Sequence, residues 1–383
     1  MESDKDIKQN TNLLDVISEW LINILKNRHN DSSPLKRLMT YLKYAVAISI
    51  FLYSLLLLLI YAGMELIGEH WWLTAFLCYL PQTIWLIPIL VLAPIAFIFY
   101  RKLMPILLIL FAFIFIFMMK FNFSLFNKSH RIDIVVMTNN IGQDNKQSLS
   151  SFIKSEKPNI ILLQESGGRT RQFTNSFSEF YFSQCGEFGI LSKYKVINSK
   201  LITSQEKNRI AIAARFELLI SNQTIIVYNV HIPSPRNNLN KLAGRGLIIA
   251  GIGTIFPINK FGDYTKNVQE SWRQHSQYYE YLCSLIEKEE KPIIAAGDFN
   301  LPNRGPSYRL LCKNMKDSFK NCGTGFGYTL PGETVNPLSL FGPWIRIDYI
   351  FAGKGFTPVY AKVEPHRKSQ HRAVVAGIKF DTQ

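Results

Sequence analysis

Cysteine is scarce in this chain of 383 residues, and its pattern excludes several classes of protein. The five cysteines include no Cys-x-x-Cys pair, so the spacing typical of a zinc site is missing. Cys312 and Cys322 are close enough in sequence to form a disulfide in an oxidising compartment, and isolated buried thiols are the alternative. Neither an internal repeat nor a low-complexity tail is present, which excludes a repeat architecture.

Acidic residues are also few, because 28 Asp and Glu stand against 43 Lys and Arg, for a net charge of +15. Near a membrane, such a charge favours contact with anionic head groups or with phosphorylated substrates. It does not identify nucleic acid as a partner by itself. A solvated basic surface is the alternative interpretation.

Long uncharged runs are what the first third of the chain has in abundance. They cover residues 45–60, 71–99 and 103–119, and each approaches or exceeds the length needed to cross about 30 Å of hydrocarbon. A cleaved signal peptide is disfavoured because a long polar segment comes first, and a buried helical core remains an alternative. We therefore predict that residues 41–122 form three transmembrane helices at about 44–62, 71–99 and 103–119, after an N-terminal segment of residues 1–40.

Charges beside these runs predict how the chain is oriented. Basic residues precede the first run, acidic residues follow it, and Arg101 and Lys102 separate the second and third runs. By the positive-inside rule the N-terminus is cytoplasmic, although Lys120 argues the other way. The N-terminal segment also has an apolar patch at helical spacing, at residues 13–24, which we expect to lie on the membrane or pack against the spans. The basic and acidic residues counted around the first run are Lys26, Arg28, Lys36, Arg37, Lys43, Glu65 and Glu69, and Lys128 and Arg131 join Lys120 after the third.

The rest of the chain, residues 130–383, alternates short apolar strands with polar strand ends. A run such as Lys291–Ala296 leads into Gly297, Asp298, Phe299 and Asn300, which puts a carboxylate and an amide two residues apart on one side of the strand end. A helix over residues 268–286 precedes that strand, so we predict an α/β layered domain with a polar rim. Strands are predicted at 132–137, 160–163, 189–192, 210–216, 224–230, 293–296, 346–351 and 373–378.

Residues 237–264 interrupt this alternation with an apolar, glycine-rich stretch. It matches neither the phosphate-loop nor the dinucleotide-binding fingerprint, and it is too short to span a membrane. An ordinary buried insertion is one interpretation, and a membrane-dipping or lid loop is the other.

Seven polar side chains stand at the predicted strand ends. Two histidines, three acids and two amides suit phosphoester hydrolysis, because a carboxylate can hold a hard divalent cation and a second can position water, while histidines stabilise phosphoryl oxygens. Taken one at a time, each residue has a structural alternative to a catalytic role, as a turn residue, a solvated strand end or a structural histidine. The seven are Asn140, Glu165, His231, Asp298, Asn300, Asp348 and His371.

These residues stand in motifs that resemble the endonuclease/exonuclease/phosphatase superfamily, over about residues 131–380. The resemblance implies a fold of two stacked mixed β-sheets flanked by helices, a four-layer sandwich, with the site at one rim. The motifs, in the order of the family, are Thr138-Asn139-Asn140, Leu163-Gln164-Glu165, Asn229-Val230-His231, Gly297-Asp298-Phe299-Asn300, Arg346-Ile347-Asp348-Tyr349 and Ser369-Gln370-His371-Arg372.

The resemblance also implies a metal site. Glu165 would bind Mg²⁺, or Mn²⁺, with support from Asn140. The family usually has Ser-Asp-His where this chain has Ser369-Gln370-His371, so an amide replaces an acid that can help to hold the metal. A neutral ligand weakens cation binding, and a catalytically silent membrane scaffold is therefore an alternative.

The remaining roles are implied in the same way. Asp298 would position the attacking water and Asn300 would bind the phosphate. His371, oriented by Asp348, would stabilise the charge that develops on phosphorus. His231 would contact a phosphate oxygen or assist the leaving group.

Three spans followed by this domain, with the loop Gly325-Phe326-Gly327-Tyr328-Thr329-Leu330-Pro331, resemble bacterial membrane phosphatases associated with teicoplanin resistance. That resemblance implies a multi-pass protein of the cytoplasmic membrane whose catalytic domain lies outside and acts on a lipid-linked phosphate or pyrophosphate. A membrane-tethered nuclease, with Arg367, Lys368 and Arg372 as part of a basic face, is one alternative. A phospholipase or sphingomyelinase-type phosphodiesterase is another.

Overall fold

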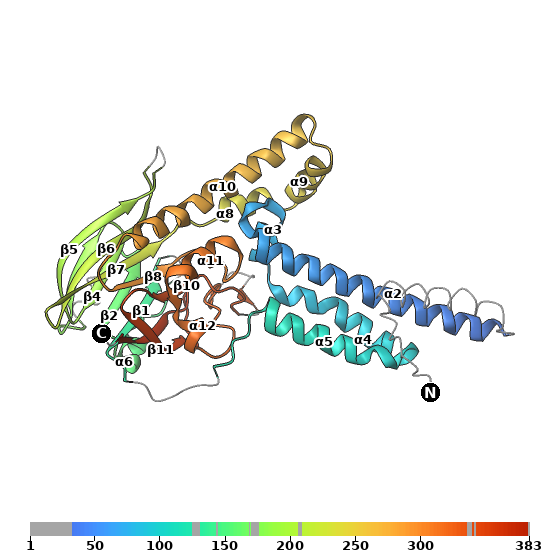
Figure 1. Cartoon of the computed structure of the whole chain (residues 1–383), viewed down its shortest axis with the longest axis horizontal. Helices are drawn as coiled ribbons and strands as arrows, with labels where there is room; N and C mark the ends of the chain where they lie inside the picture. Colours follow the sequence, from blue (N-terminus) through green and yellow to red (C-terminus); the bar gives the residue numbers. More distant parts are fainter. Residues whose placement is uncertain are drawn as a thin grey trace, which may run out of the picture. The chain divides into compact units, whose positions relative to one another are not determined.

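The apolar strands of the second part of the chain pair into two six-stranded sheets in the computed structural model (Figure 1). The structure describes residues 33–124, 131–142, 145–167, 169, 176–205, 209–334, 339–340 and 342–381. The amphipathic patch predicted at residues 13–24 lies outside the described residues, as do Lys26, Arg28 and Lys128.

The first sheet has the order β11-β12-β1-β2-β4-β3 and is mixed, because β1 runs parallel to β2 and antiparallel to β12. Alternating and continuous apolar residues make these segments strands, and β1, β2 and β4 are buried along nearly their whole length. Its strands are β1 (Ile134–Asn140), β2 (Ile160–Gln164), β3 (Tyr181–Cys185), β4 (Phe188–Ser192), β11 (Phe356–Val363) and β12 (Val374–Phe380).

The second sheet has the order β5-β6-β7-β8-β10-β9 and is mixed as well, with β7 parallel to β8 and β10 antiparallel to β8. A two-residue turn at Ser221 and Asn222, both with positive φ, joins β6 to β7. Its strands are β5 (Lys195–Thr203), β6 (Ala211–Ile220), β7 (Gln223–His231), β8 (Ile293–Asp298), β9 (Lys316–Asp317) and β10 (Asp348–Ala352).

Apolar side chains of the two sheets meet in a shared core, and helices cover the outer faces. Phe188 of the first sheet and Phe216 of the second are fully buried in that core. On the outer face of the second sheet, α10 contributes Tyr279 and α11 contributes Leu311 to another core. On the outer face of the first sheet, α6 contributes Phe152.

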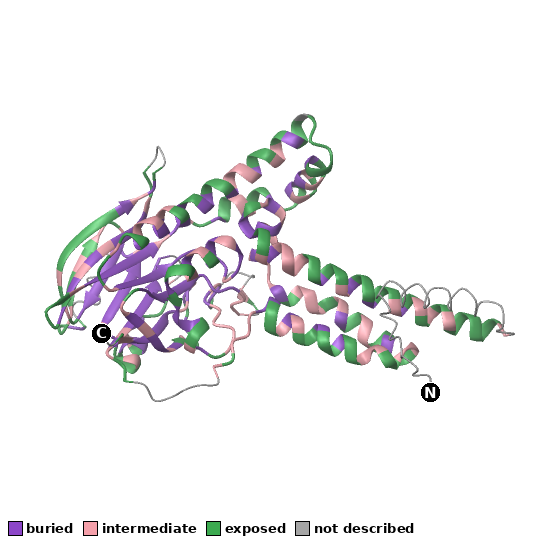
Figure 2. Ribbon diagram, viewed as in Figure 1, coloured by how far each residue is buried: buried purple, intermediate pink, exposed green. Residues whose placement is uncertain are grey.

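This arrangement of helix, sheet, sheet and helix confirms the predicted fold class, and Figure 2 shows the buried strands between exposed helix faces. The helices of this part are α6 (Ser150–Glu156), α8 (Arg236–Lys241), α9 (Arg245–Ile255), α10 (Asn259–Glu287), α11 (Gly305–Asn314) and α12 (Ser318–Cys322).

Three helical segments among the described residues are long and apolar enough to cross a membrane, at Pro34–His70, Gln82–Phe99 and Arg101–Met118. Only 17% to 22% of the most apolar stretch of each segment is buried inside the protein, and Phe51 and Leu90 are apolar side chains with 63% and 73% exposure. A buried helical core would cover such side chains, so the exposure favours lipid contact. The helices are α2 (Pro34–Ala62), η2 (Gly63–Ile67), η3 (Gly68–His70), η4 (Gln82–Leu86), α4 (Ile87–Phe99), η5 (Arg101–Leu103), α5 (Met104–Phe113) and η6 (Ile114–Met118).

The apolar run at residues 71–99 is divided in the structure. Helix α3 (Trp72–Tyr79) ends before Pro81, which has no N–H to continue a helix, and η4 begins at Gln82. The buried side chains of Trp72 and Ala75 pack with Val268 and Trp272 of α10. The first part of this run therefore belongs to a globular core and only the second part forms an apolar span.

Contacts group the chain into two compact units. One consists of residues up to Leu55 together with Leu86–Phe111, and the other of Leu56–Trp85 together with Ala112–Gln383. The second unit contains both sheets, and it also includes α3 and the residues that follow α5. The segment predicted as an insertion, residues 237–264, forms α8, α9 and the start of α10 in this unit.

Candidate active site

The strand order brings five of the seven predicted residues to one rim of the two sheets. Asn140 ends β1, Glu165 directly follows the parallel β2, and His231 and Asp298 end the parallel strands β7 and β8 as partners in register. Asp348 begins the antiparallel β10 directly opposite Asp298. Carboxyl ends of parallel strands and amino ends of antiparallel neighbours meet at the same edge of a sheet.

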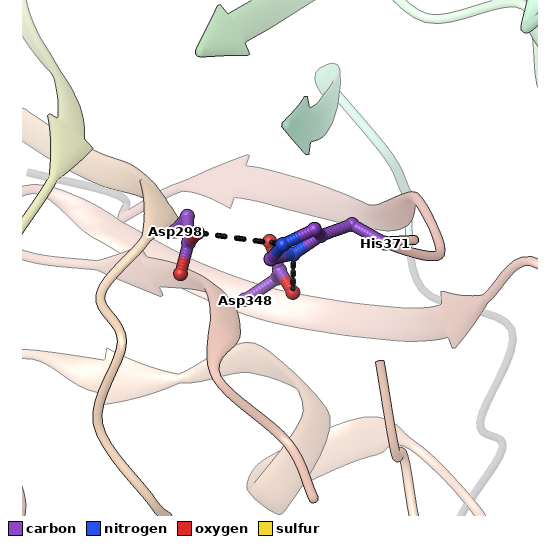
Figure 3. A group of neighbouring side chains, drawn as sticks. All are labelled: Asp298, Asp348 and His371. Carbon is purple, nitrogen blue, oxygen red and sulfur yellow. Dashed lines mark hydrogen bonds and ion pairs between the residues drawn. The ribbon is translucent and has the colours of Figure 1, made fainter. Parts of the chain in front are cut away.

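His371 reaches the same rim from the loop before β12, which pairs with β1 near its polar end. Its Nδ1 lies 3.1 Å from Oδ2 of Asp348 and its Nε2 lies 3.8 Å from Oδ2 of Asp298. Figure 3 shows the imidazole between the two carboxylates. The three residues are buried and offer oxygen and nitrogen atoms within 4.8 Å of one another.

His231, like His371, is held at Nδ1 by a carboxylate. Its Nδ1 lies 2.8 Å from Oε1 of Glu187, in the turn between β3 and β4, and its Nε2 lies 3.8 Å from both Oε1 of Glu165 and Oδ2 of Asp298. Two imidazoles thus point their Nε2 atoms at one oxygen of Asp298, each held at Nδ1 by its own carboxylate. A separation of 3.8 Å is longer than a hydrogen bond, so both Nε2 atoms stay available for a substrate.

Asn140 ties the two sheets together at the base of the site. Its Nδ2 donates to Oε1 of Glu165 at 3.0 Å and to Oδ2 of Asp298 at 3.2 Å, while its Oδ1 accepts the Gly142 N–H at 2.9 Å. Because an N–H only donates, its bond from Gly142 fixes which atom of the Asn140 amide is the oxygen.

The oxygens of Asn140 and Glu165 fit a hard divalent cation. A Cβ placed at Gly142 would collide with Oε2 of Glu165 and come within 3.0 Å of Oδ1 of Asn140, so glycine leaves these oxygens the space beside them. The Glu165 side chain is 35% exposed and can be reached from solvent. A carboxylate with an amide oxygen is the donor chemistry that Mg²⁺ prefers.

Asn300 shapes the loop after β8 and contacts the other groups. Its N–H donates to Oδ1 of Asp298 at 2.9 Å, and its Nδ2 donates to the Ile232 carbonyl at 2.9 Å, next to His231. Asn300 and Glu165 have positive φ of 47° and 50°, a conformation that is uncommon for residues other than glycine. Both strained residues follow strand ends at the rim.

The charges around the two imidazoles raise the pKa of each. Burial alone lowers the pKa of His371, but the carboxylates of Asp348 and Asp298 outweigh it and raise the pKa to about 9. Burial likewise opposes protonation of His231, and the hydrogen bond with Glu187 and the charge of Asp298 raise its pKa above the ordinary value. His371 is therefore a cation at neutral pH.

For Asp298, burial raises the pKa and the two neighbouring histidines lower it. Burial, aided by Asp348, outweighs the histidines and Asn140, so the pKa of the carboxyl lies above the usual range. A more basic carboxylate at the rim is suited to accept a proton from a water molecule bound there.

Several site residues have no distinguishing signal in the sequence. Glu187 is one, because only the stacking of the sheets brings its turn to His231. Asn229 and Gln164 stand inside the motifs but next to the residues singled out, and they bridge the sheets through a bond of 2.6 Å from Gln164 Nε2 to Asn229 Oδ1. Gln164 directly precedes Glu165, and Asn229 lies two residues before His231, on the same side of β7.

Arg367 does not belong to an exposed basic face, and that expectation was wrong. It is 2% exposed, and its guanidinium pairs with Glu364 at 2.9 Å and donates to the Asn139 side chain and the His371 carbonyl. Arg346 pairs with buried Asp317 at 2.6 Å, while Asp348 holds His371.

The cysteines show no disulfide in the structure. All five are free, and Cys312 and Cys322 are half-buried thiols. Cys322 Sγ lies 3.2 Å from the Pro358 carbonyl.

The sequence model of the endonuclease/exonuclease/phosphatase family matches residues 137–371, from β1 to the last histidine of the site. The chain belongs to this family. Members of the endonuclease/exonuclease/phosphatase family are hydrolases of phosphoesters and nucleic acids that generally depend on a divalent metal, which agrees with the donor set at the rim.

Solved structures of this fold are similar to the chain at low identity. A family protein from Bacteroides vulgatus is 16% identical, with a TM-score of 0.47, over 66% of this chain and 100% of its own. A mannosyl-6-phosphatase from Bacteroides thetaiotaomicron is 14% identical, with a TM-score of 0.43, over 65% and 100%. Truncated TDP2 from Caenorhabditis elegans is 18% identical, with a TM-score of 0.41, over 65% and 97%. No curated protein sequence matches the chain.

Proposed function

We propose that this family member is a membrane-bound, Mg²⁺-dependent phosphohydrolase that cleaves a phosphoester or pyrophosphate of a lipid-linked substrate. The observation that carries the proposal is the presence, in one chain, of the convergent rim and three apolar helices. Membrane helices confine the rim to the neighbourhood of a bilayer, where lipid-linked phosphates are concentrated and chromosomal DNA is not. The resemblance to membrane phosphatases associated with teicoplanin resistance supports the same substrate class.

Glu165 and Asn140 would hold the cation, and Mg²⁺ or Mn²⁺ bound there neutralises charge on the phosphoryl oxygens. Gln370 replaces an acid in the family motif, but its backbone carbonyl accepts the Gly332 N–H at 2.6 Å, which gives this position a structural task independent of charge. The donor pair of Glu165 and Asn140 does not require residue 370.

Asp298 would orient and deprotonate the attacking water. Its Oδ1 is held by the Asn300 N–H, so Oδ2 is the oxygen that faces the two histidines. The raised pKa of Asp298 makes its carboxylate a stronger base at neutral pH. Asn300 keeps its proposed role in phosphate binding.

The protonated His371 would stabilise the charge that develops on the phosphoryl group. Asp348 fixes its Nδ1, so its Nε2–H points into the rim next to Asp298. His231, fixed by Glu187, would contact another phosphoryl oxygen or protonate the leaving group. Two oriented N–H donors would form an electrostatic clamp around the phosphoryl group in the transition state.

Hydrolysis of defined substrates by the purified full chain tests this proposal. The substrates are a polyprenyl pyrophosphate, a phospholipid, sphingomyelin and duplex DNA, each with Mg²⁺ and with a chelator. We expect Mg²⁺-dependent release of phosphate from the polyprenyl pyrophosphate, and a loss of about a hundredfold or more for Asp298→Asn and for His371→Gln. Asp263→Asn, on the exposed surface of α10, is the matched control that should keep full activity.

Each outcome distinguishes the alternatives. Preference for duplex DNA with a steep decline in salt would identify a nuclease, and preference for a phospholipid or sphingomyelin would identify a phosphodiesterase. Activity that survives both site substitutions would rule out this rim as the site. Absence of hydrolysis of every substrate would favour a silent scaffold.

The proposal includes an orientation, with the N-terminus in the cytoplasm and the catalytic unit outside a bacterial cytoplasmic membrane. The basic residues before the first span and the acidic residues after it support this direction. Proteolysis of the catalytic unit in intact cells with a permeabilised outer layer, but not in inverted vesicles, is the expected result.

A further inference from the structure

On helix α9 (Arg245–Ile255), three isoleucines face outward, and small residues together with Leu247 face the core. Ile248 and Ile255 are 64% and 72% exposed, whereas Gly246, Ala250 and Gly253 are buried. A helix on the surface of a water-soluble domain has the reverse arrangement, with polar residues outward. The inverted arrangement indicates that water is not the medium outside α9.

The small residues let α9 pack closely on α10, so its orientation is fixed. Oγ1 of Thr265, on α10, donates to the Ala250 carbonyl at 3.0 Å. A side chain at Gly253 would collide with the Phe261 carbonyl of α10. Because the α9 backbone is held at this face, Ile248, Ile252 and Ile255, spaced four and three residues apart, remain on the opposite face.

The turn that connects α9 to α10 (Asn259–Glu287) continues the apolar surface. Phe256, Ile258 and Phe261 are 59%, 65% and 45% exposed, and the turn is drawn as exposed in Figure 2. Residues 246–258 contain no charged side chain. We call the exposed side chains of Ile248, Ile252, Ile255, Phe256, Ile258 and Phe261 the hairpin tip.

The hairpin is bound to the residues that end the first apolar span, Pro34–His70. Gln269 of α10 donates from Nε2 to the His70 carbonyl at 2.8 Å and accepts the Trp72 N–H at 2.9 Å. The indole of Trp72 donates to Oγ1 of Thr254 in α9 at 3.1 Å. These contacts join the hairpin to the end of the first span.

We propose that the hairpin tip inserts into the outer layer of the bilayer beside the end of the first span. With eleven residues, α9 is about 16 Å long, which is too short to cross about 30 Å of hydrocarbon. It can lie in the interface with its isoleucine face among the acyl chains. This contact would fix the catalytic unit against the membrane at a second position besides the spans.

Fluorescence quenching in vesicles tests the proposal with the full chain. A single cysteine at Ile255, in a background in which the five native cysteines are replaced by serine or alanine, carries an environment-sensitive fluorophore. Vesicles of phosphatidylethanolamine and phosphatidylglycerol contain a lipid with a nitroxide near the top of its acyl chain. A cysteine at Gln277, an exposed residue further along α10, is the matched control, and one at Ile248 is a second probe of the tip.

We expect the nitroxide lipid to quench the labels at 255 and 248 by roughly twofold or more, with little effect at 277. Equal quenching at 255 and 277 in variants that keep the thermal unfolding of the parent would overturn the proposal. So would quenching or shielding at 255 that is seen only when several protein copies share a vesicle, because a second copy of the chain would then cover the tip.

Discussion

Asp348 controls the protonation of His371, and this gives the residue pair a measurable pH dependence. Asp348 lies 3.1 Å from Nδ1 of His371, and the pKa of His371 is raised to about 9, above its ordinary value of 6.5. The charged imidazole is therefore favoured in the folded state. Its contribution to stability is complete below about pH 6.5 and is lost as the pH rises through about 9.

Asp348→Asn should consequently move the alkaline limb of activity to lower pH. The neutral amide keeps a hydrogen-bond partner but removes the charge, so we expect the limb to shift down by about one to two pH units. The measurement is the pH profile of kcat/KM, with Asp263→Asn as the control of equal charge change. An unshifted limb for Asp348→Asn would mean that another group sets it.

Gly142 controls the space beside the proposed metal ligands. Gly142→Ala puts a methyl group against Oε2 of Glu165 and near Oδ1 of Asn140, while a Cβ at Gly167 meets nothing within 4 Å. We expect Gly142→Ala to raise the Mg²⁺ concentration for half-maximal activity by about tenfold or more, as found for residues that orient metal ligands. Gly167→Ala is the matched control. If the two variants have the same Mg²⁺ dependence, Glu165 and Asn140 do not form the metal site.

At the scale of elements, α3 (Trp72–Tyr79) connects the segment between two apolar spans with the loop after β8. The Tyr79 hydroxyl donates to the Asn300 carbonyl at 2.8 Å, and its ring lies 5.6 Å from that of Trp272 on α10. Tyr279 of α10 supports the same loop by donating to the Phe299 carbonyl at 2.9 Å. Two helices from different parts of the chain thus hold the strained backbone at Asn300.

Tyr79→Phe should lower kcat with little change in the fold. It removes one hydrogen bond, worth about 1 kcal/mol, from a loop that positions Asp298 and Asn300, so we expect a loss of about fivefold in kcat. The KM of the variant for a soluble phosphodiester should stay within about twofold of the KM of the parent chain. Tyr181→Phe, on the exposed edge strand β3, is the control. An unchanged kcat, or equal losses in both variants, would show that Tyr79 does not position the loop.

The strand ends could be predicted from the sequence because each apolar run stops at a polar residue. That pattern locates Asn140, Glu165, His231 and Asp298, and the parallel pairing of β1 with β2 and of β7 with β8 then brings them to one edge. The partners of these groups follow no such pattern. Glu187 reaches His231 from a turn in the other sheet, and Tyr79 stands in an apolar run that reads as a membrane span. Both depend on tertiary packing that the local sequence does not encode.

At the scale of the whole molecule, the compact unit that contains both sheets also includes residues before the predicted catalytic domain at 130–383. Residues 56–85 and the segment after Phe111 share a compact unit with both sheets. Glu69, which is 7% exposed, accepts the Ser307 N–H at the start of α11, and Arg304 donates to the Met118 carbonyl. The predicted boundary at residue 130 cuts all of these contacts.

A fragment that begins at residue 130 should therefore be less stable than the full chain. Its loss of Trp72 and Ala75 uncovers Trp272 and Val268, and the loss of Glu69 leaves the first turn of α11 without its carboxylate partner. Uncovering two large apolar side chains costs about 2 kcal/mol or more, which lowers Tm by several degrees. The measurement compares thermal unfolding of the fragment and of the full chain in the same detergent.

The matched control separates this loss from a general effect of removing the membrane helices. Trp72→Ala in the full chain keeps every span but empties the same contact with Trp272, so it should reproduce part of the decrease in Tm. A fragment as stable and as active on a soluble phosphodiester as the full chain would contradict the extended unit. The site would then be complete in residues 130–383, and α3 would serve the membrane anchor rather than the chemistry.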